Sequence, residues 1–221
     1  MITLVVEAST YAGSAALLDG PVLRGERSVA MRGREHEALM PAVAELLAAH
    51  DVAPASLERI VCGAGPGSFT SLRIAGAIAK GLALAAACPL VPVSSLALLI
   101  ASLEAPVAGR YLACVDAMRG EHYVAPFALG DDGDVKALGP EMRIATALID
   151  EQARQWDARP IGPGQPGPAD VVPHARGAVR LLGMIEAEPP ADLARWEPAY
   201  GRLAEAQVKW EATHGRSLEA V

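Results

Sequence analysis

One segment of this chain carries more information than any other: Gly63-Ala64-Gly65-Pro66-Gly67-Ser68-Phe69-Thr70-Ser71-Leu72-Arg73. It follows a short apolar run at 60–63 that predicts a buried strand, and it opens a predicted helix over about 70–87. Glycines between a strand and a helix are the context in which backbone N–H groups can hold an anion. A structural turn with a helix cap explains the same glycines, so the spacing leaves an anion site and a structural turn both open.

The signatures of known phosphate-binding and catalytic loops do not fit this segment. Three predicted strands precede the glycines, whereas the dinucleotide-binding fingerprint follows the first strand of its unit. The segment has no Gly-Lys-Ser or Gly-Lys-Thr, which excludes a Walker P-loop. Ser68 has Pro66 and Thr70 at the two positions where a nucleophile elbow has glycines. His36-Glu37 is followed by Met40 where a zinc protease has its second histidine, so we expect no dedicated metal site.

The elements around this segment predict an α/β protein in two lobes. Predicted strands lie at 2–8, 13–18, 22–30, 60–63, 90–93, 111–117 and 121–129. Predicted helices lie at about 36–50, 70–87, 94–103, 174–185 and 203–213. The strand pattern restarts after Pro106, which predicts a first lobe at 1–105 and a reduced second lobe at 106–221. We expect the last helix to pack back on the first lobe.

The composition excludes several classes of protein. Of 221 residues 52% are hydrophobic, so the chain can bury a sizeable core and is not disordered. The net charge of −7 argues against a protein that grips nucleic acid by itself, because phosphate contacts need a basic face. The longest apolar stretch, about 74–93, is interrupted by Lys80 and two prolines, and the N-terminus lacks the basic region of a signal peptide. We therefore expect a cytoplasmic protein without membrane association, whose three cysteines are free thiols.

Two acidic residues stand at predicted strand ends in similar surroundings. Val5-Val6-Glu7-Ala8 matches Cys114-Val115-Asp116-Ala117, and a glycine follows each, as a duplicated fold would leave. In two-lobed sugar kinases and actin-like ATPases, such acids hold a metal and position water. Glu7 and Asp116 are therefore candidates for a carboxylate pair in a cleft between the lobes. Coincidence between two hairpins, with acids that only cap turns, explains them as well.

Gly65-Pro66-Gly67-Ser68-Phe69-Thr70, followed by Leu72-Arg73-Ile74, resembles the TsaB (YeaZ) family. Further matches are 79–83, 91–96, Asp116-Ala117-Met118-Arg119-Gly120-Glu121-His122-Tyr123 and 197–202. The likeness is close up to about residue 125 and looser beyond. The resemblance marks as family motif or nucleotide contact Glu7, Ser9, Gly65, Pro66, Gly67, Ser68, Phe69, Thr70, Arg73, Asp116, Arg119, Gly120 and Glu121. Glu7 stands where the family usually has Asp, and Ser71 where it usually has Gly.

The resemblance implies a two-lobed α/β fold of the actin, sugar-kinase and Hsp70 (ASKHA) type, with mixed sheets and a reduced second lobe. It implies a non-catalytic subunit in the synthesis of N6-threonylcarbamoyladenosine in tRNA. Its implied partners are a TsaD-like catalytic subunit, in a heterodimer, and a TsaE-like ATPase, with a homodimer when the chain is alone. It implies no intrinsic cofactor, ATP or ADP at an interface of the assembled complex, and tRNA binding only through that complex. Ser95 and Leu99 stand where TsaD has two metal-binding histidines, so we expect no metal and no catalytic residue.

Two enzyme hypotheses compete with this interpretation. The first is an active ASKHA-type small-molecule kinase or ATPase that uses Glu7 and Asp116. The second is a metallo-glycopeptidase, an older description of the family. The short chain argues against the kinase, because phosphotransferases of this architecture generally need a larger second lobe to close over nucleotide. The missing histidine pair argues against the peptidase.

The partner interface is predicted on the helices at about 36–50 and 70–87. On the second helix, large apolar residues fall on one side and small ones gather on an adjacent face, which a partner helix can approach closely. The resemblance implies the same pairing, through a bundle of two helices from each chain. The predicted interface residues are Leu39, Val43, Leu46, Leu47, Ala75, Gly76, Ala79, Ala83 and Ala86. The alternative is that the small face is buried under the first helix of the same chain.

Overall fold

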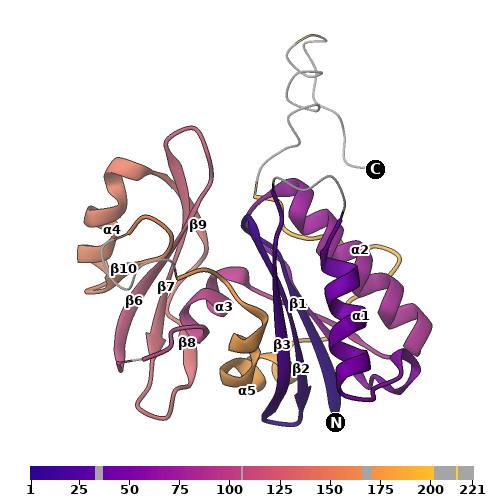
Figure 1. Ribbon diagram of the computed structural model, residues 1–221. Coiled ribbons are helices and arrows are strands. Elements are labelled where there is room, and N and C mark those ends of the chain that lie inside the picture. The colour runs from indigo at the N-terminus through magenta and orange to yellow at the C-terminus, as the bar shows by residue number, and fades with distance from the viewer. Residues whose placement is uncertain (33–36, 106, 166–170, 202–212, 214–221) are drawn as a thin grey trace.

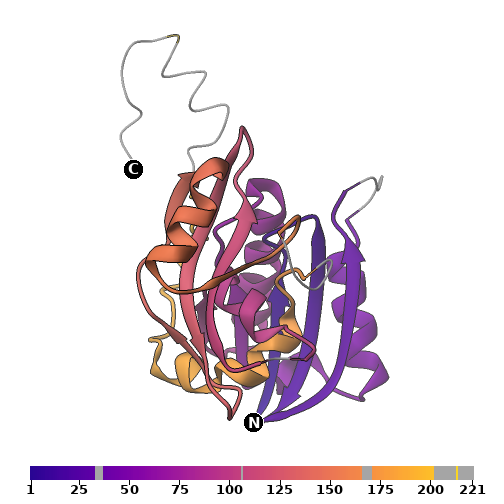
Figure 2. The same cartoon turned by 90° about the vertical axis from the view of Figure 1, so that its left-hand side faces the viewer.

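The protein has two lobes, each built on a five-stranded mixed sheet, in a computed structural model that describes residues 1–32, 37–105, 107–165, 171–201 and 213 (Figure 1). Turned by 90°, the sheet of the second lobe stands in front of the first lobe, with helix α4 (Ile149–Gln155) on its outer side (Figure 2). The expected α/β class with two mixed sheets is confirmed.

The first sheet has the strand order β3-β2-β1-β4-β5. Its strands are β1 (Ile2–Glu7), β2 (Ala12–Asp19), β3 (Val22–Ala30), β4 (Arg59–Gly63) and β5 (Leu90–Val93). β1 pairs antiparallel with β2 and parallel with β4. Along β1, Leu4 and Val6 join the core cluster on one face of the sheet, and Val5 joins the cluster on the other. A strand that is buried on both faces needs apolar residues throughout, which explains the continuous apolar run at the start of the chain.

Two helices cover one face of the first sheet. These are α1 (Leu39–Ala49), which is followed by the short 3-10 helix η1 (Pro54–Ser56), and α2 (Phe69–Ala86) (Figure 1). By length and composition alone α2 could cross a membrane, with a mean hydropathy of 1.3, a test that core helices of soluble proteins also pass. Its buried side packs with β1 and β4 in one cluster, so its apolar character serves the contact with the sheet.

The second sheet has the strand order β10-β6-β7-β8, and β9 also pairs with β7. Its strands are β6 (Gly109–Asp116), β7 (Glu121–Leu129), β8 (Val135–Ala137), β9 (Met142–Ala145) and β10 (Arg159–Ile161). The 3-10 helix η2 (Thr146–Leu148) leads into α4, which packs against β6 and β10. The predicted strands at 111–117 and 121–129 are confirmed as β6 and β7, whereas β8, β9 and β10 are additional.

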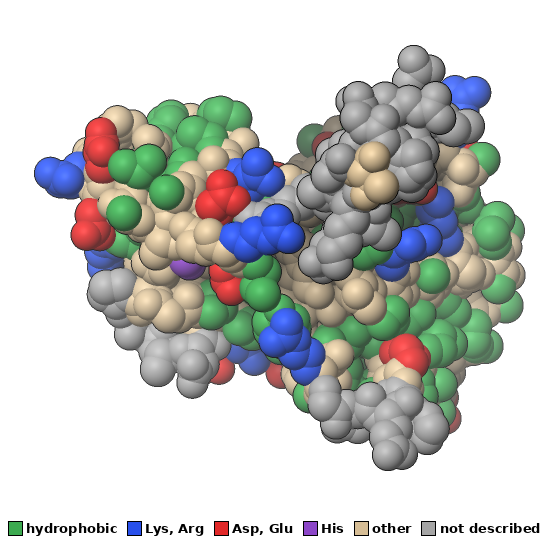
Figure 3. All heavy atoms as spheres, turned by 90° about the horizontal axis from the view of Figure 1, so that it is seen from above, with side chains coloured by type: hydrophobic (Ala, Val, Ile, Leu, Met, Phe, Trp, Pro, Cys, Tyr) green, Lys and Arg blue, Asp and Glu red, His purple; other side chains and the backbone are tan. Residues whose placement is uncertain are grey.

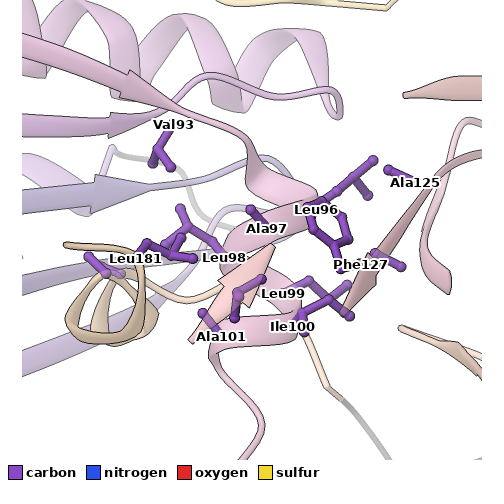
Figure 4. Close-up of a cluster of buried hydrophobic side chains, with 14 of the residues drawn as sticks. Val93, Leu96, Ala97, Leu98, Leu99, Ile100, Ala101, Ala125, Phe127 and Leu181 are labelled. Atoms are coloured by element: carbon purple, nitrogen blue, oxygen red, sulfur yellow. The ribbon is translucent and has the colours of Figure 1, made fainter. Parts of the chain in front are cut away.

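The helix α3 (Ser95–Ala101) lies between the two sheets, and all of its side chains are buried. It packs against β6, β7 and β8 of the second lobe. Figure 4 shows Leu96 of α3 beside Phe127 of β7, and Leu98 beside Leu181, all in one core cluster that also includes Val5 and Val61 of the first sheet. The two lobes therefore share a continuous apolar core.

After residue 171 the chain returns to the first lobe. The 3-10 helix η3 (Ala175–Leu181) packs against α3 and against β1, β2 and β3, and α5 (Leu182–Ala187) packs against β5. The single helix predicted at 174–185 is thus divided into η3 and α5. The predicted second lobe, 106–221, includes residues 175–196, whose apolar side chains pack in clusters that also contain residues of the first sheet. The last predicted helix, about 203–213, lies outside the described residues apart from Thr213.

Candidate functional site

A buried hydrogen-bond network joins the carboxyl ends of β1, β4 and β5. Glu7, the last residue of β1, is 0% exposed. Its Oε2 accepts a hydrogen bond from Ser95 Oγ at 2.8 Å, and its Oε1 accepts one from the backbone N–H of Ser9. Ser95 Oγ accepts in turn from the backbone N–H of Gly65 at 3.0 Å. Burial raises the pKa of Glu7. This carboxyl group therefore holds β1, the turn after β4 and the first turn of α3 together, with no surface left for a ligand.

The glycine-rich turn after β4 is held by the same elements. The backbone N–H of Ser68 donates to Ser9 O at 2.7 Å, and that of Ser95 donates to Gly65 O at 2.9 Å. Gly65 has a φ of +94°, and a Cβ on Gly67 would lie 2.1 Å from Ser9 O, so both positions require glycine. Because the N–H groups of Gly65 and Ser68 already have partners inside the chain, they are not free to hold an anion. The geometry favours the structural turn, and these residues do not fit a nucleotide phosphate held by this chain alone.

Asp116 lies in a different environment from Glu7. It ends β6, is exposed, and accepts a hydrogen bond from the backbone N–H of Met118 at 2.7 Å. Met118 and Arg119 both have positive φ, 64° and 57°, in a left-handed turn that Gly120 completes. Asp116 therefore stabilises its own turn, while Glu7 is inside the first lobe. The hypothesis that the two acids face a common cleft is wrong, because the Glu7 carboxylate is enclosed by Ser9, Ser95 and Gly63.

The remaining motif residues surround the start of α2 and the turn after β6. Pro66 is buried, Thr70 is exposed, and the Arg73 guanidinium lies 5.3 Å from the centre of the Phe69 ring. Glu121 forms an ion pair with Arg143 of β9 at 3.7 Å. The structure places Glu7, Ser9, Gly65, Gly67 and Ser68 together. Asp116, Arg119, Gly120 and Glu121 form a separate turn in the second lobe.

Most of the predicted partner interface is inside this chain. All of its residues except Ala86 are buried. Seven of them belong to the hydrophobic cluster between the first sheet and its two helices: Leu39, Val43, Leu46, Leu47, Ala75, Ala79 and Ala83. Gly76 is covered by the chain's own C-terminal segment, since a Cβ there would lie 3.1 Å from Pro198 Cγ. These residues therefore pack within the chain, where the small side chains let α2 approach its own sheet and C-terminal segment closely.

A different face of the two helices is exposed and mainly apolar, with Glu45 as an acidic residue within it, and we call it the outer helix face. Its members share helical spacing and point away from the sheet: Met40, Pro41, Ala44 and Ala48 on α1, and Ala77, Gly81, Leu84 and Ala85 on α2. Leu84 is 67% exposed. Hydrophobic side chains gather on the right-hand side of the first lobe in Figure 3, where α1 and α2 lie. The 77, 81, 84 spacing is visible in the sequence, but periodicity does not say which face of an apolar helix meets the sheet.

Within the parts of the chain that the structure describes, no group of three or more His, Cys, Asp or Glu side chains could hold a metal ion. Ser95 and Leu99 are both buried in α3, and Ser95 is bonded to Glu7. The three cysteines are free, and burial raises the pKa of Cys114 to about 12.

Comparisons with known proteins agree with this architecture. The family model described as "TsaD: tRNA N6-adenosine threonylcarbamoyltransferase" matches residues 31–155, more than half of the chain. The tRNA threonylcarbamoyladenosine biosynthesis protein TsaB of Bacillus subtilis is 29% identical, over 95% of this chain and 98% of its own. TsaB of Escherichia coli is 30% identical, over 70% of this chain and 67% of its own.

A solved structure from Pseudomonas aeruginosa, described as an uncharacterized protein with similarity to peptidase YeaZ, superposes with a TM-score of 0.75 at 26% identity. The superposition covers 91% of this chain and 99% of that one. Together with the two mixed sheets, these matches confirm the expected actin-like ASKHA fold. The sequence and structural matches agree over nearly the whole length, and the chain belongs to the TsaB (YeaZ) family.

Proposed function

We propose that this chain is a non-catalytic subunit in the synthesis of N6-threonylcarbamoyladenosine in tRNA, and that it binds a TsaD-type threonylcarbamoyltransferase through the outer helix face. Its TsaB-named relatives support the pathway. The observation that carries the binding role is the exposed, mainly apolar surface of α1 and α2, which includes the 67% exposed Leu84 near the end of α2. Apolar surface of this kind on a soluble fold marks an interaction site.

The arrangement of the acids supports binding over catalysis. A kinase or ATPase of this fold would need carboxylates that reach a bound metal and water, and Glu7 is instead enclosed by hydrogen bonds. The space between the sheets, where a nucleotide would have to enter, is filled by the side chains of α3. We therefore place ATP or ADP at an interface of the assembled complex, and we assign no metal or catalytic residue to this chain.

The proposal extends to three further partners: a second copy of the chain, a TsaE-type ATPase and tRNA. A homodimer of the isolated chain would use the outer helix face and would compete with the TsaD-type subunit. A TsaE-type ATPase would bind the assembled pair in the cytoplasm. The net charge of −7 favours tRNA binding only through the complex.

The test is a titration of the TsaD-type subunit from the same source into this chain and two variants. Leu84→Arg puts a charge on the outer helix face, and Leu148→Arg is the matched control on an exposed leucine of η2 in the second lobe. We expect the wild type and Leu148→Arg to bind alike and Leu84→Arg to lose about tenfold or more in affinity, with an unchanged melting temperature. Wild-type affinity in a folded Leu84→Arg variant would place the interface elsewhere. A wild-type chain that does not bind at all would end the proposal.

A further inference from the structure

Residues 191–201, which we call the strap, run along the first lobe beside α2, where Figure 1 shows them in yellow. The backbone N–H of Ala191 donates to Leu90 O of the edge strand β5 at 2.8 Å. The backbone N–H of Ala199 donates to Ala64 O, in the turn after β4, at 2.7 Å. The strap is therefore fixed at both of its ends to the first lobe.

The strap contacts α2 at Gly76, and we call this contact the strap seat. A Cβ at this position would lie 3.1 Å from Pro198 Cγ and 3.7 Å from Trp196 Cζ3, so the glycine lets the strap approach the helix closely. One turn later, Lys80 Nζ lies 5.8 Å from the Trp196 ring, and at the start of α2 the Phe69 ring lies 4.6 Å from that of Tyr200. The strap thus covers the side of α2 that neither the sheet nor the outer helix face uses.

The end of the strap also contacts the second lobe. Tyr123 of β7 donates a hydrogen bond from its hydroxyl to Tyr200 O at 3.3 Å. Gly201 has a φ of +66°, and a Cβ there would lie 2.4 Å from Tyr123 Cε1. At the other lobe, a Cβ on Gly65 would lie 2.5 Å from Ala199 O. Gly65 and Gly201, both with positive φ, therefore allow the close contacts of the strap with the two lobes. Through these contacts the strap links α2 to β7.

The strap seat continues directly into the outer helix face. Gly76, Lys80 and Leu84 are spaced four residues apart, so they form one ridge along α2. The strap covers the first part of this ridge, and Leu84 at its end is 67% exposed. Any protein that binds Leu84 therefore meets a helix whose neighbouring turns are held by the strap.

We propose that the strap is a positioning element for the partner-binding surface, so that strap docking and partner binding stabilise each other. This inference rests on the proposed function and adds its regulation. A released strap leaves Gly76 and Phe69 uncovered and removes the contacts that hold the first half of α2 from outside. The partner must then also order this region, which weakens its binding. By linkage, the bound partner must oppose release of the strap by the same factor.

Two measurements test the coupling on the full chain. The first is the affinity for the TsaD-type subunit of Gly76→Val, which wedges the strap away, and of Gly183→Val, a matched helical glycine where a Cβ would meet nothing within 4 Å. The second is the rate of tryptic cleavage after Arg195, whose side chain is 90% exposed within the strap, because a protease needs the surrounding segment to come away from the surface.

We expect Gly76→Val to be cut faster after Arg195 and to bind the partner about tenfold more weakly, while Gly183→Val matches the wild type. Saturating partner should slow cleavage of the wild type by a similar factor. Faster cleavage with unchanged affinity, or wild-type cleavage that the partner does not slow, would overturn the coupling.

A second variant is used if the melting temperature of Gly76→Val lies far below that of the wild type. Trp196→Ala leaves α2 intact and removes the contact with Lys80, and it should weaken partner binding in the same direction. A folded Trp196→Ala chain with normal affinity would contradict the proposal. Failure of the wild type itself to bind the TsaD-type subunit would overturn the proposed function, and the coupling with it. Normal wild-type binding with unaffected variants would overturn the coupling alone.

Discussion

The Ser95 hydroxyl donates a hydrogen bond to the Glu7 carboxylate at 2.8 Å, although 88 residues separate them in the chain. The bond joins the end of the first strand to the first turn of α3, the helix that lies between the lobes. A carboxylate that sequence similarity places beside a nucleotide is thus part of the packing inside the first lobe. From the environment of Glu7 we predict how substitutions there change the stability of the chain and how that stability depends on pH.

Replacing Glu7 by Gln should change how stability depends on pH. In the folded chain, burial raises the pKa of Glu7 above its ordinary value of 4.5. The protonated group therefore stabilises the folded wild type below pH 4.5, and this stability is lost as the pH rises through the folded-state pKa. The free energy of unfolding of Glu7→Gln, relative to the wild type, should therefore increase between about pH 5 and pH 8. Urea unfolding at both pH values checks this, with the exposed Glu186→Gln as control. A constant difference would contradict it.

Two glycine-to-alanine variants should have opposite effects. A Cβ on Gly63 would lie 1.6 Å from Glu7 Oε2, so Gly63→Ala should lower the free energy of unfolding by about 2 kcal/mol or more. A Cβ on Gly81, inside α2, would meet nothing within 4 Å. Gly81→Ala should therefore raise it by up to about 1 kcal/mol, through helix propensity. Equal effects in denaturant titrations would show that the carboxylate of Glu7 moves away at little cost.

The two sides of α2 should respond differently to arginine. Ala79 is 0% exposed and belongs to the cluster of the first sheet, whereas Ala77 is exposed on the outer helix face. Ala79→Arg should lower the free energy of unfolding by about 3 kcal/mol or more, because it buries a charge in a packed core. Ala77→Arg should change it by less than about 0.5 kcal/mol. Thermal melts followed by circular dichroism give the comparison, and an Ala79→Arg chain that melts normally would contradict the observed packing.

His174 should make the chain less stable in mild acid. Its Nε2 lies 2.9 Å from Ser28 Oγ, and its Nδ1 accepts a hydrogen bond from the backbone N–H of Arg176 at 3.1 Å. Burial lowers the pKa of His174 from its ordinary value of 6.5, and Arg176 lowers it further, while Glu26 opposes both. The folded chain therefore favours the neutral ring, and the resulting stability is complete above pH 6.5 and is lost as the pH falls towards the folded-state pKa.

The comparison for His174 is between the wild type and His174→Gln at about pH 7.5 and about pH 5, with urea midpoints as the measurement. The wild type should lose more stability than the variant over this range. Equal losses would show that protonation of His174 is accommodated, most directly by Glu26 Oε2, which lies 3.9 Å from Nδ1.

Much of the fold could be predicted from local patterns. β1 and β4 contain the continuous apolar runs 4–6 and 60–62 because the sheet is covered on both faces, and such short runs are typical of buried strands. The segment 63–73 predicts the passage from β4 into α2 because glycine is needed where Gly65 and Gly67 approach Ala199 and Ser9. β8 and β10 have three residues each, which is too short for a period to be recognised, and their pairing with β7 and β6 is a tertiary event.

The candidate site depended on information that spacing does not contain. Apolar and small residues on α2 predict an amphipathic helix, but Ala79 meets the sheet and Leu84 meets solvent only because of how the helix is rotated in the assembled lobe. Glu7 and Asp116 likewise have similar sequence surroundings, but only the tertiary structure shows that Glu7 lies in a buried hydrogen-bond network and Asp116 in an exposed turn.

The sequence by itself determined most of the helices and strands, the glycine positions and the membership of a family, because these depend on local conformation and on residue identity at short range. Only the tertiary structure decided which faces are available. Burial depends on what a distant part of the chain places against a residue: the strap covers Gly76, α3 fills the space between the sheets, and Ser95 encloses Glu7. Those contacts join residues far apart in the sequence, and they leave the outer faces of α1 and α2 exposed to solvent.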